Sequence, residues 1–529
     1  MERVDAAQVP PKTTLQGLDA ALSALAQAQA ADPAGDMAGA ARLAGLATTG
    51  HLVRVVAETD PVMPGPAVAA VVDAGGTVEL QYEGWVQALV PVAALPGLAT
   101  SPGIRFVRAP YAPQSAAITS EGIAGMGLER WHSSGLTGRG AKLAVLDLGF
   151  DGYWNVLGTE LPANPVIRSF RADADITGSG NVHGTAAAEI AFDVAPEATL
   201  YLVNFATEGE LGQAVDWLIS EGVNVISSSV GWPGTAYGDG RGSVNGIVAK
   251  AERAGVTWVQ AAGNYGNTHW TGYFHDPEGN GFHNFRDSDE GNTIRLRRTT
   301  TTEERVFRIE VFLTWDDWDT LNQDFDLFLF RGETVVAQST AFQNGQFPPV
   351  EHIVHSTAAP GDYWVGVQRF RASRRTKLDL VVTTDFAMEY REPAESLVIP
   401  ADSVAALTVG AVAPGTLTPR IYSSRGPTKD GRPKPELVAA DGVSTFILGP
   451  GGFSGTSASA PAVAGAATLY LAARPGTRPP IVRRFLTGRA RGGMLGNPLI
   501  GAGSVFLGDF PPAAMFPISP NRSPIGSRF

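Results

Sequence analysis

Residues 455–461 read Gly-Thr-Ser-Ala-Ser-Ala-Pro and open a run of small residues in the last part of the chain. These small side chains predict a helix over Ala458–Ala472 that packs closely behind its first turn. A serine hydroxyl is a poor nucleophile unless a base takes its proton, and a neutral imidazole can do so at neutral pH. Ser457 is therefore a candidate nucleophile that needs a base and hydrogen-bond donors from elsewhere in the chain.

Three other segments place suitable polar residues at the edges of predicted strands and helices. Asp147 ends an apolar strand at Lys142–Leu146, and His183 comes directly before a predicted helix. Asn264 ends another strand, in the sequence Ala-Ala-Gly-Asn. A carboxylate behind an imidazole fixes its tautomer and stabilises the imidazolium that forms. The side-chain amide of Asn264 and the backbone N–H of Ser457, at a helix N-terminus, can both donate to an oxyanion.

The chain from Lys142 to Asn264 alternates between apolar strands and helical stretches. Strands that are apolar throughout and joined by helices indicate a parallel sheet covered on both faces. Ligands bind to such sheets beyond the carboxyl ends of the strands. The predicted strands are 142–146, 199–203, 223–227 and 256–261, followed by 404–409, and the predicted helices are 185–192, 211–220 and 244–254.

These segments resemble the signatures of the subtilase family of serine proteases. The signatures are Asp-x-Gly, His-Gly-Thr, Ala-Ala-Gly-Asn and Gly-Thr-Ser-x-x-x-Pro, and the triad residues occur in the family's order. They lie at residues 147–149, 183–185, 261–264 and 455–461. The resemblance covers roughly residues 120–275 and 396–508.

The resemblance implies a subtilisin-like α/β fold, with helices on both faces of a parallel sheet. It implies peptide-bond hydrolysis through an acyl-enzyme, with Asp147, His183 and Ser457 as the triad and Asn264 in the oxyanion hole. It also implies a first substrate pocket walled by two short stretches, whose lining residues are Ser229, Val230, Gly231, Ala261, Ala262 and Gly263. Neither stretch carries a carboxylate, which argues against a strict preference for basic residues.

Three residues depart from the family pattern. Leu148 stands where the family usually has a small hydroxyl residue, and Glu189 where a small residue normally packs in the histidine helix. Asp441 replaces the proline that is usual in the Ala-Ala-Pro-Gly turn. One interpretation is drift with repacking, and the other is a shifted pH optimum or a degraded triad.

Changes of composition divide the chain into five predicted segments. The predicted order is a partly helical or mobile leader, a propeptide-like α+β domain, a catalytic domain interrupted by an inserted β-sandwich or jelly-roll domain, and a Pro-rich tail. The corresponding residues are 1–50, 51–112, 113–280 with 394–509, 281–393 and 510–529.

The two flanking domains each have two interpretations. The 51–112 domain resembles the inhibitory propeptide of subtilases, which implies an intramolecular inhibitor and self-cleavage around Tyr111–Ser120; the alternative is an unrelated substrate-binding domain. The 281–393 domain resembles the jelly-roll modules of many bacterial subtilases. It either restricts and guides substrates or only stabilises the fold.

The formal net charge of −12 argues against nucleic acid or an anionic membrane as the main partner, since both bind basic surfaces. The chain has no cysteine, which excludes disulfides and a cysteine nucleophile. No apolar run reaches the length of a membrane span, and the first residues lack the apolar core of a secretory signal. We nevertheless expect a secreted or extracytoplasmic bacterial protein, because that is where the family resemblance points.

A loop at 276–281, with Asp287 beyond it, loosely imitates an EF-hand calcium loop. A polar turn explains the same residues, so structural calcium is one of two interpretations, and catalysis itself requires no cofactor. Zinc is not expected at His275 and His283, because the chain lacks cysteine and a His-Glu-x-x-His motif.

Two rival functions fit parts of the pattern. A sedolisin shares a serine-containing turn but uses acidic residues, so His183 and Asn264 count against it. A catalytically weak or inactive subtilase-fold binding protein is the rival from another class, and the presence of all four site residues counts against that.

Overall fold

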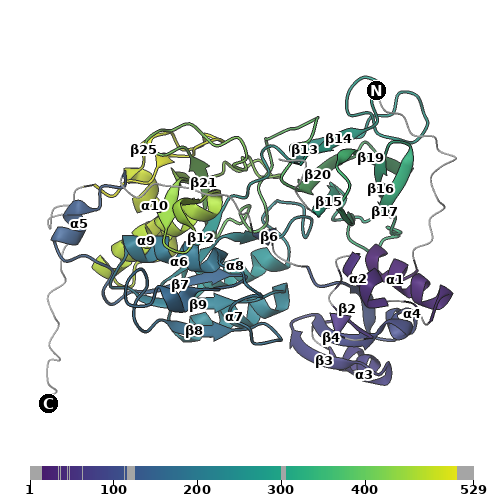
Figure 1. Cartoon of the computed structure of the whole chain (residues 1–529), viewed down its shortest axis with the longest axis horizontal. Helices are drawn as coiled ribbons and strands as arrows, with labels where there is room; N and C mark the ends of the chain where they lie inside the picture. The colour runs from purple at the N-terminus through teal and green to yellow at the C-terminus, as the bar shows by residue number, and fades with distance from the viewer. Residues whose placement is uncertain are drawn as a thin grey trace, which may run out of the picture.

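The computed structural model describes residues 15–508 except 34, 36, 44–45, 47, 50, 62, 112–113, 116–124 and 299–305. The chain forms three parts (Figure 1): an N-terminal domain drawn in purple, a central α/β domain, and a β domain drawn in teal to green. The α/β domain is built from segments on both sides of the β domain in sequence, so the β domain is an insertion.

The central sheet of the α/β domain has nine strands in the order β25-β26-β22-β21-β12-β10-β7-β9-β8. All neighbouring strands from β26 to β8 run parallel, and only β25 is antiparallel to its neighbour. The core strands β7, β10 and β12 are buried along nearly their whole length, as expected for a sheet covered on both faces. The strands are β7 (Lys142–Asp147), β8 (Val166–Ser169), β9 (Thr199–Asn204), β10 (Val225–Ser228), β12 (Thr257–Ala261), β21 (Ala406–Val412), β22 (Leu437–Ala440), β25 (Arg491–Gly492) and β26 (Gly503–Ser504).

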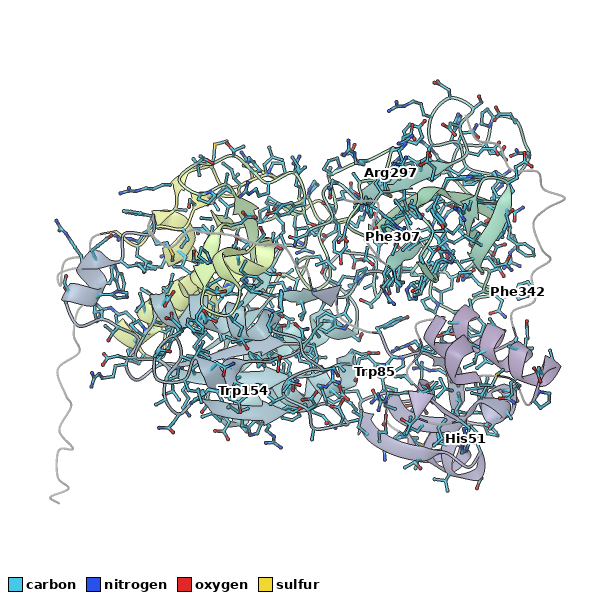
Figure 2. The ribbon with its side chains drawn as sticks, in the orientation of Figure 1. His51, Trp85, Trp154, Arg297, Phe307 and Phe342 are labelled. Carbon is cyan, nitrogen blue, oxygen red and sulfur yellow. The ribbon has the colours of Figure 1, made fainter. Side chains whose placement is uncertain are left out.

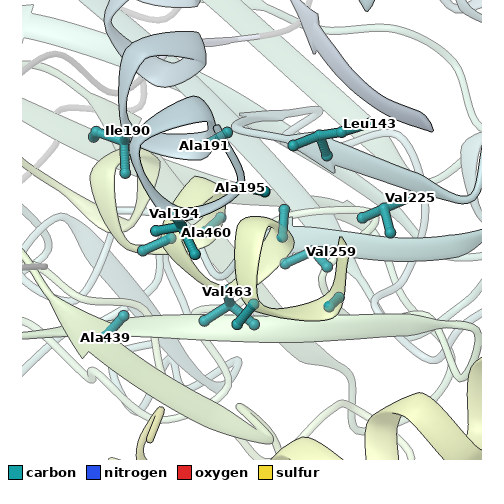
Figure 3. Packing of buried hydrophobic residues seen from close by; sticks show 14 of the residues in the cluster. Leu143, Ile190, Ala191, Val194, Ala195, Val225, Val259, Ala439, Ala460 and Val463 are labelled. Atoms are coloured by element: carbon teal, nitrogen blue, oxygen red, sulfur yellow. The ribbon is translucent and has the colours of Figure 1, made fainter. Parts of the chain in front are cut away.

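Two pairs of helices pack on this sheet, together with α10 (Pro479–Arg489). The helices α6 (His183–Val194) and α9 (Thr456–Ala473) share one core cluster, and α7 (Glu208–Ser220) and α8 (Ser243–Arg253) share another. Small side chains allow α6 and α9 to approach closely, and Figure 3 shows the α6 residues packed beside those of α9. A Cβ atom at Gly465 of α9 would lie 2.5 Å from Cβ of Val194, so this contact requires glycine.

The β domain consists of two four-stranded antiparallel sheets that enclose a shared apolar core. One sheet has the order β13-β20-β15-β18 and the other β14-β19-β16-β17. The sequence predicts strands at 293–297, 305–314, 325–330, 333–338, 363–368 and 378–384, but not β13 or β18. The strand β13 also precedes the predicted boundary at residue 281, although it pairs with β20. The strands are β13 (His269–Tyr273), β14 (Asn292–Leu296), β15 (Phe307–Trp315), β16 (Asp324–Arg331), β17 (Thr334–Ser339), β18 (Val350–Thr357), β19 (Gly361–Arg371) and β20 (Lys377–Thr383).

The N-terminal domain is an antiparallel sheet with helices packed on it. Its strands are β1 (Thr48–Thr49), β2 (Leu52–Thr59), β3 (Thr77–Tyr82), β4 (Trp85–Pro91) and β5 (Ile104–Arg108), and its helices are α1 (Ala20–Ala31), α2 (Met37–Leu43), α3 (Gly65–Asp73) and α4 (Leu95–Ala99).

The helices α1 and α2 lie within the predicted leader but belong to this domain. Leu18, Leu22 and Leu25 are buried in the same apolar cluster as Val53 and Val55 of β2. The helical spacing of the leucines therefore gives a helix with one apolar face that completes the domain core. Residue 50 does not separate a leader from a folded unit, and the predicted boundary there differs from the structure.

The N-terminal domain contacts both other domains. Tyr82 of β3 packs on α7, where a Cβ atom at Gly212 would lie 2.5 Å from its ring. Trp85 packs against the apolar cluster shared by α7 and α8, and it lies where the N-terminal domain faces the α/β domain (Figure 2). On the other side, the ring of Phe106 contacts the ring of Phe347 of the β domain, with 4.5 Å between centroids.

Among the residues that the structure describes, no helix has both the length and the apolarity to cross a membrane.

Candidate active site

Asp147 and His183 form a buried hydrogen-bonded pair at the carboxyl end of β7. Both carboxylate oxygens of Asp147 lie 2.8 Å from Nδ1 of His183, and the two side chains are 0% and 6% exposed. Oδ1 of Asp147 also accepts a hydrogen bond from the backbone N–H of Leu148 at 2.8 Å. An imidazole held this way carries its proton on Nδ1 and presents Nε2 as the basic nitrogen.

The residues after the histidine explain why this pair can form. A Cβ atom at Gly184 would lie 2.5 Å from the carbonyl oxygen of Gly149 and 2.8 Å from Cβ of Asp147. Glycine is therefore needed for α6 to begin against the end of β7. The hydroxyl of Thr185 donates to the carbonyl of Asp151 at 2.8 Å and ties the helix to the segment that follows the aspartate.

Ser457 lies in the first turn of α9, buried against the end of β10. Its hydroxyl donates to the carbonyl oxygen of Ser229 at 3.4 Å, and its own carbonyl accepts from the hydroxyl of Ser229 at 3.0 Å. Nε2 of His183 is buried and has no hydrogen-bond partner among the described residues. Since α6 and α9 pack against each other, the candidate base and nucleophile come from adjoining helices on the same face of the sheet.

Asn264 is oriented by Thr456, the residue before the candidate nucleophile. Its Oδ1 accepts from both the backbone N–H and the hydroxyl of Thr456, each at 3.0 Å. The hydroxyl of Thr456 accepts in turn from the N–H of Gly263 at 3.1 Å. The Nδ2 group is left buried with no partner in the described part of the chain. An amide donor fixed in this way can bind a charge that develops during a reaction.

Gly455 gives this donor its space. The residue has φ of +92°, a left-handed conformation that glycine adopts without strain, and a Cβ atom there would lie 2.5 Å from Nδ2 of Asn264. The glycine of the Gly-Thr-Ser sequence is thus required by both the backbone turn and the asparagine beside it.

The predicted pocket residues come from two neighbouring segments of the sheet. Val230 and Gly231 form the short strand β11, directly after Ser229. Ala261 ends β12, and Ala262 and Gly263 follow it. Val398 packs between the two segments, since a Cβ atom at Gly231 would lie 2.4 Å from its Cγ1 and one at Gly263 2.9 Å from it. The structure therefore brings the six predicted residues together around apolar side chains.

A short piece of chain after the N-terminal domain pairs with one of these segments. The strand β6 (Gln114–Ser115) is antiparallel to β11, with Ser115 opposite Val230 and Gln114 opposite Gly231. The chain between the N-terminal and α/β domains thus adds a strand to β11, which directly follows Ser229, the hydrogen-bond partner of Ser457.

The three departures from the family pattern have identifiable contacts. Leu148 is half-buried and packs against the apolar cluster shared by α7 and α8. Asp441 is buried, its Oδ1 lies 2.7 Å from Arg420, and its Oδ2 accepts from the N–H of Gly455 at 3.2 Å. Burial raises the pKa of Asp441, and Arg420 opposes that rise. Glu189 accepts two backbone hydrogen bonds from the chain that leads to Ser457.

The calcium-like loop uses its first carboxylate for internal contacts. Oδ1 of Asp276 accepts from the N–H of Gly279 at 2.7 Å, and Oδ2 lies 3.1 Å from Arg369. No group of three or more metal-ligating side chains occurs in the described residues. Calcium binding at this loop stays a prediction.

Two functional candidates were not singled out in the sequence. Thr456 orients Asn264, and Phe453 places its ring edge-on against the ring of His183, with 5.1 Å between centroids and 81° between planes. The threonine stands within the serine signature and could have been found there. Phe453 gave no signal, because its contact depends on how the preceding hairpin folds.

Comparison with known proteins concerns the family and the fold. The model of the subtilase family matches residues 138–293 and 389–503. Subtilisin E of Bacillus subtilis is 30% identical over 212 residues, a match covering 37% of this chain and 53% of that protein. Subtilisin Savinase of Lederbergia lenta is 32% identical over 152 residues, covering 26% and 52%. The chain spans about half the length of the curated relatives it matches.

A solved structure resembles a large part of the fold. The CspB protease of Clostridium perfringens superposes with a TM-score of 0.52 at 18% identity, covering 73% of this chain and 96% of that one. At this identity the likeness concerns the fold. The superposed share of this chain is larger than the share matched by the family model, which lies mainly in the α/β domain.

Proposed function

Because the chain belongs to the subtilase family, we propose that it is a serine endopeptidase that hydrolyses peptide bonds through an acyl-enzyme on Ser457. The observation that carries this proposal is the buried pair of Asp147 and His183, whose Nε2 has no partner among described residues. A neutral imidazole with a free basic nitrogen is the group that a serine nucleophile needs.

In the proposed reaction, Oγ of Ser457 attacks the carbonyl carbon of the peptide while Nε2 of His183 takes its proton. Asp147 keeps the proton on Nδ1 and stabilises the imidazolium. Nδ2 of Asn264 and the backbone N–H of Ser457 donate to the oxyanion. The imidazolium then protonates the leaving amine as the C–N bond breaks. Water repeats the sequence and releases the acid product from the serine.

We propose that the N-terminal domain inhibits the enzyme until it is removed. Three contacts support this: its β3 packs on α7, its Arg108 pairs with Glu208 of α7 at 2.6 Å, and β6 lies along β11. A peptide strand paired with β11 takes the place that a substrate strand would occupy. Cleavage in the connecting chain, around the predicted Tyr111–Ser120, would free that position.

The substrate class follows from the walls of the pocket. Val230, Ala261 and Ala262 are buried, and neither segment carries a charged side chain. We therefore propose protein or peptide substrates with an uncharged residue before the cleaved bond. Catalysis needs no cofactor in this scheme. The relatives named above are bacterial proteins, and we propose a secreted or extracytoplasmic location.

The test compares the wild-type chain with Ser457→Ala. The wild type should hydrolyse a denatured protein and become labelled by a fluorophosphonate, and the variant should do neither while keeping its circular dichroism spectrum. Loss of the triad serine in a subtilisin lowers turnover by about a millionfold. A wild-type chain that neither hydrolyses nor labels, or a variant that retains turnover, would overturn the proposed function.

A further inference from the structure

Glu189 places a carboxylate inside the helix that carries His183. Its side chain belongs to α6, is only 1% exposed, and follows the buried residues Ala186, Ala187 and Ala188. A carboxylate in such surroundings is costly unless hydrogen bonds compensate for the water it has lost. The role proposed above for His183 does not involve this group.

The hydrogen bonds come from a hairpin that leads to Ser457. The hairpin consists of β23 (Val443–Thr445) and β24 (Gly449–Phe453), and the backbone N–H groups of Phe446 and Ile447 lie at its tip. They donate to the two carboxylate oxygens of Glu189 at 2.5 and 3.2 Å. The histidine helix therefore holds the tip of this hairpin directly.

The same hairpin contacts the surroundings of all three candidate triad residues. Its last residue, Phe453, meets the ring of His183 edge-on at 5.1 Å. Its tip packs on the loop after Asp147, because a Cβ atom at Gly152 would lie 2.5 Å from Cδ1 of Ile447. Its second strand continues into the first turn of α9, which carries Ser457.

We propose that Glu189 is a positioning residue of the active site: by binding the hairpin tip to the histidine helix, it keeps Phe453 against His183 and fixes the path of the chain into Ser457. The inference rests on the proposed function, and its effect should appear in turnover more than in substrate binding. A displacement of about 1 Å near a catalytic group can cost as much as about 100-fold in rate.

The ionised form of Glu189 is the form that offers both oxygens fully to the two N–H groups. Burial raises the pKa of Glu189 to about 7, and the nearby carboxylates of Glu160 and Asp193 add to the rise. The hairpin, residues 443–453, contains no charged side chain. Glu189 should therefore lose its proton near pH 7, and from then on both of its oxygens are full acceptors for the N–H groups of the hairpin tip.

Stability and activity should then move in opposite directions. Because the folded-state pKa is raised above the usual 4.5, this group stabilises the fold fully below about pH 4.5, and that contribution is lost as pH rises through about 7. Positioning, in contrast, improves over the upper part of that range. A residue with only a structural role would change turnover in parallel with stability.

The test measures kcat, KM and melting temperature from pH 5.5 to 9 for the full chain, Glu189→Gln and the control Asp193→Asn. Asp193 lies on the same helix and is exposed. We expect Glu189→Gln to lower kcat about tenfold, to leave KM within about twofold, and not to lower the melting temperature at pH 8. Asp193→Asn should retain wild-type kcat at pH 9, where Glu189 is ionised in both proteins.

The pH dependence of kcat gives a second readout. Because Glu189→Gln should retain about a tenth of the activity, protonated Glu189 should also retain about a tenth, so wild-type kcat should approach that of Glu189→Gln at pH 5.5 and exceed it about tenfold at pH 9. A ratio of wild-type to variant kcat that does not change with pH, or a variant with unchanged kcat, overturns the positioning role. Failure of the wild type to react with a fluorophosphonate instead overturns the proposed function.

Discussion

Replacing Asn264 should separate the oxyanion donor from the structure that holds it. Its Nδ2 has no partner among described residues, so the substitution of Asn264 by Ala breaks no hydrogen bond made by that group before the reaction. Removal of one oxyanion donor costs about 100- to 1,000-fold in kcat, or about 3–4 kcal/mol of transition-state stabilisation. We expect Asn264→Ala to lose turnover in this range while KM changes little.

The other half of the same side chain has a structural role that must be controlled. Oδ1 accepts two hydrogen bonds from Thr456, and each net hydrogen bond contributes about 1 kcal/mol. Asn264→Ala should therefore also lower the free energy of unfolding by about 1–3 kcal/mol. Asn264→Asp keeps an acceptor for Thr456 but removes the donor, so it should retain more stability and still lose turnover.

The assay is hydrolysis of a chromogenic peptide under saturating conditions, with thermal unfolding measured on the same preparations. Both variants should fall at least 100-fold in kcat, and only Asn264→Ala should melt clearly earlier. If Asn264→Asp kept kcat within about threefold of the wild type, the asparagine would act by holding Thr456. The assignment of Nδ2 as an oxyanion donor would then be wrong.

Two further variants test the inhibitory domain and the turn before Ser457. Arg108→Ala leaves Glu208 buried without its cationic partner, which costs about 3–5 kcal/mol where such a pair is fully buried. The N-terminal domain should therefore separate sooner in size-exclusion chromatography, and activity should appear earlier. An unchanged delay before activity appears would contradict the proposed inhibitory contact. Burial raises the pKa of Asp441 despite Arg420, so its ionised form costs the fold stability at pH 8, and Asp441→Asn, which keeps an oxygen for the N–H of Gly455, should not lower the urea midpoint at that pH. A lower midpoint would show that the pair with Arg420 outweighs the cost of burying the carboxylate.

The family and the α/β fold could be predicted because their signals lie within short, continuous segments of the sequence. The strand Lys142–Asp147 is buried on both faces and its inner residues 143–146 are all apolar, so it can be recognised without knowledge of its neighbours. The signature glycines are equally local, since Gly184 and Gly455 occupy places where any Cβ atom would collide. The predicted family and the parallel sheet with helices are confirmed. The roles of Asp147, His183, Ser457 and Asn264 stay predictions, now with a geometry that permits them.

The features that were missed depend on contacts between distant segments. The strand β13 contains Gly272 and has no alternating pattern, so its place in a sheet follows only from its pairing with β20. The strand β18 carries polar side chains such as His352, which bonds to Glu310 on the neighbouring strand at 2.9 Å. Neither pairing leaves a periodic signal in a single segment.

Two of the departures from the family pattern, Glu189 and Asp441, contact the same segment of chain. Glu189 binds the tip of the 443–453 hairpin, and Asp441 binds Gly455 just beyond its end. A carboxylate that replaces a small residue and another that replaces a proline thus act on opposite ends of one segment. Two buried carboxylates that were merely tolerated would have no reason to converge on the chain entering Ser457. Their convergence favours repacking over a degraded triad, and the pH profile of kcat is the property that tests this interpretation.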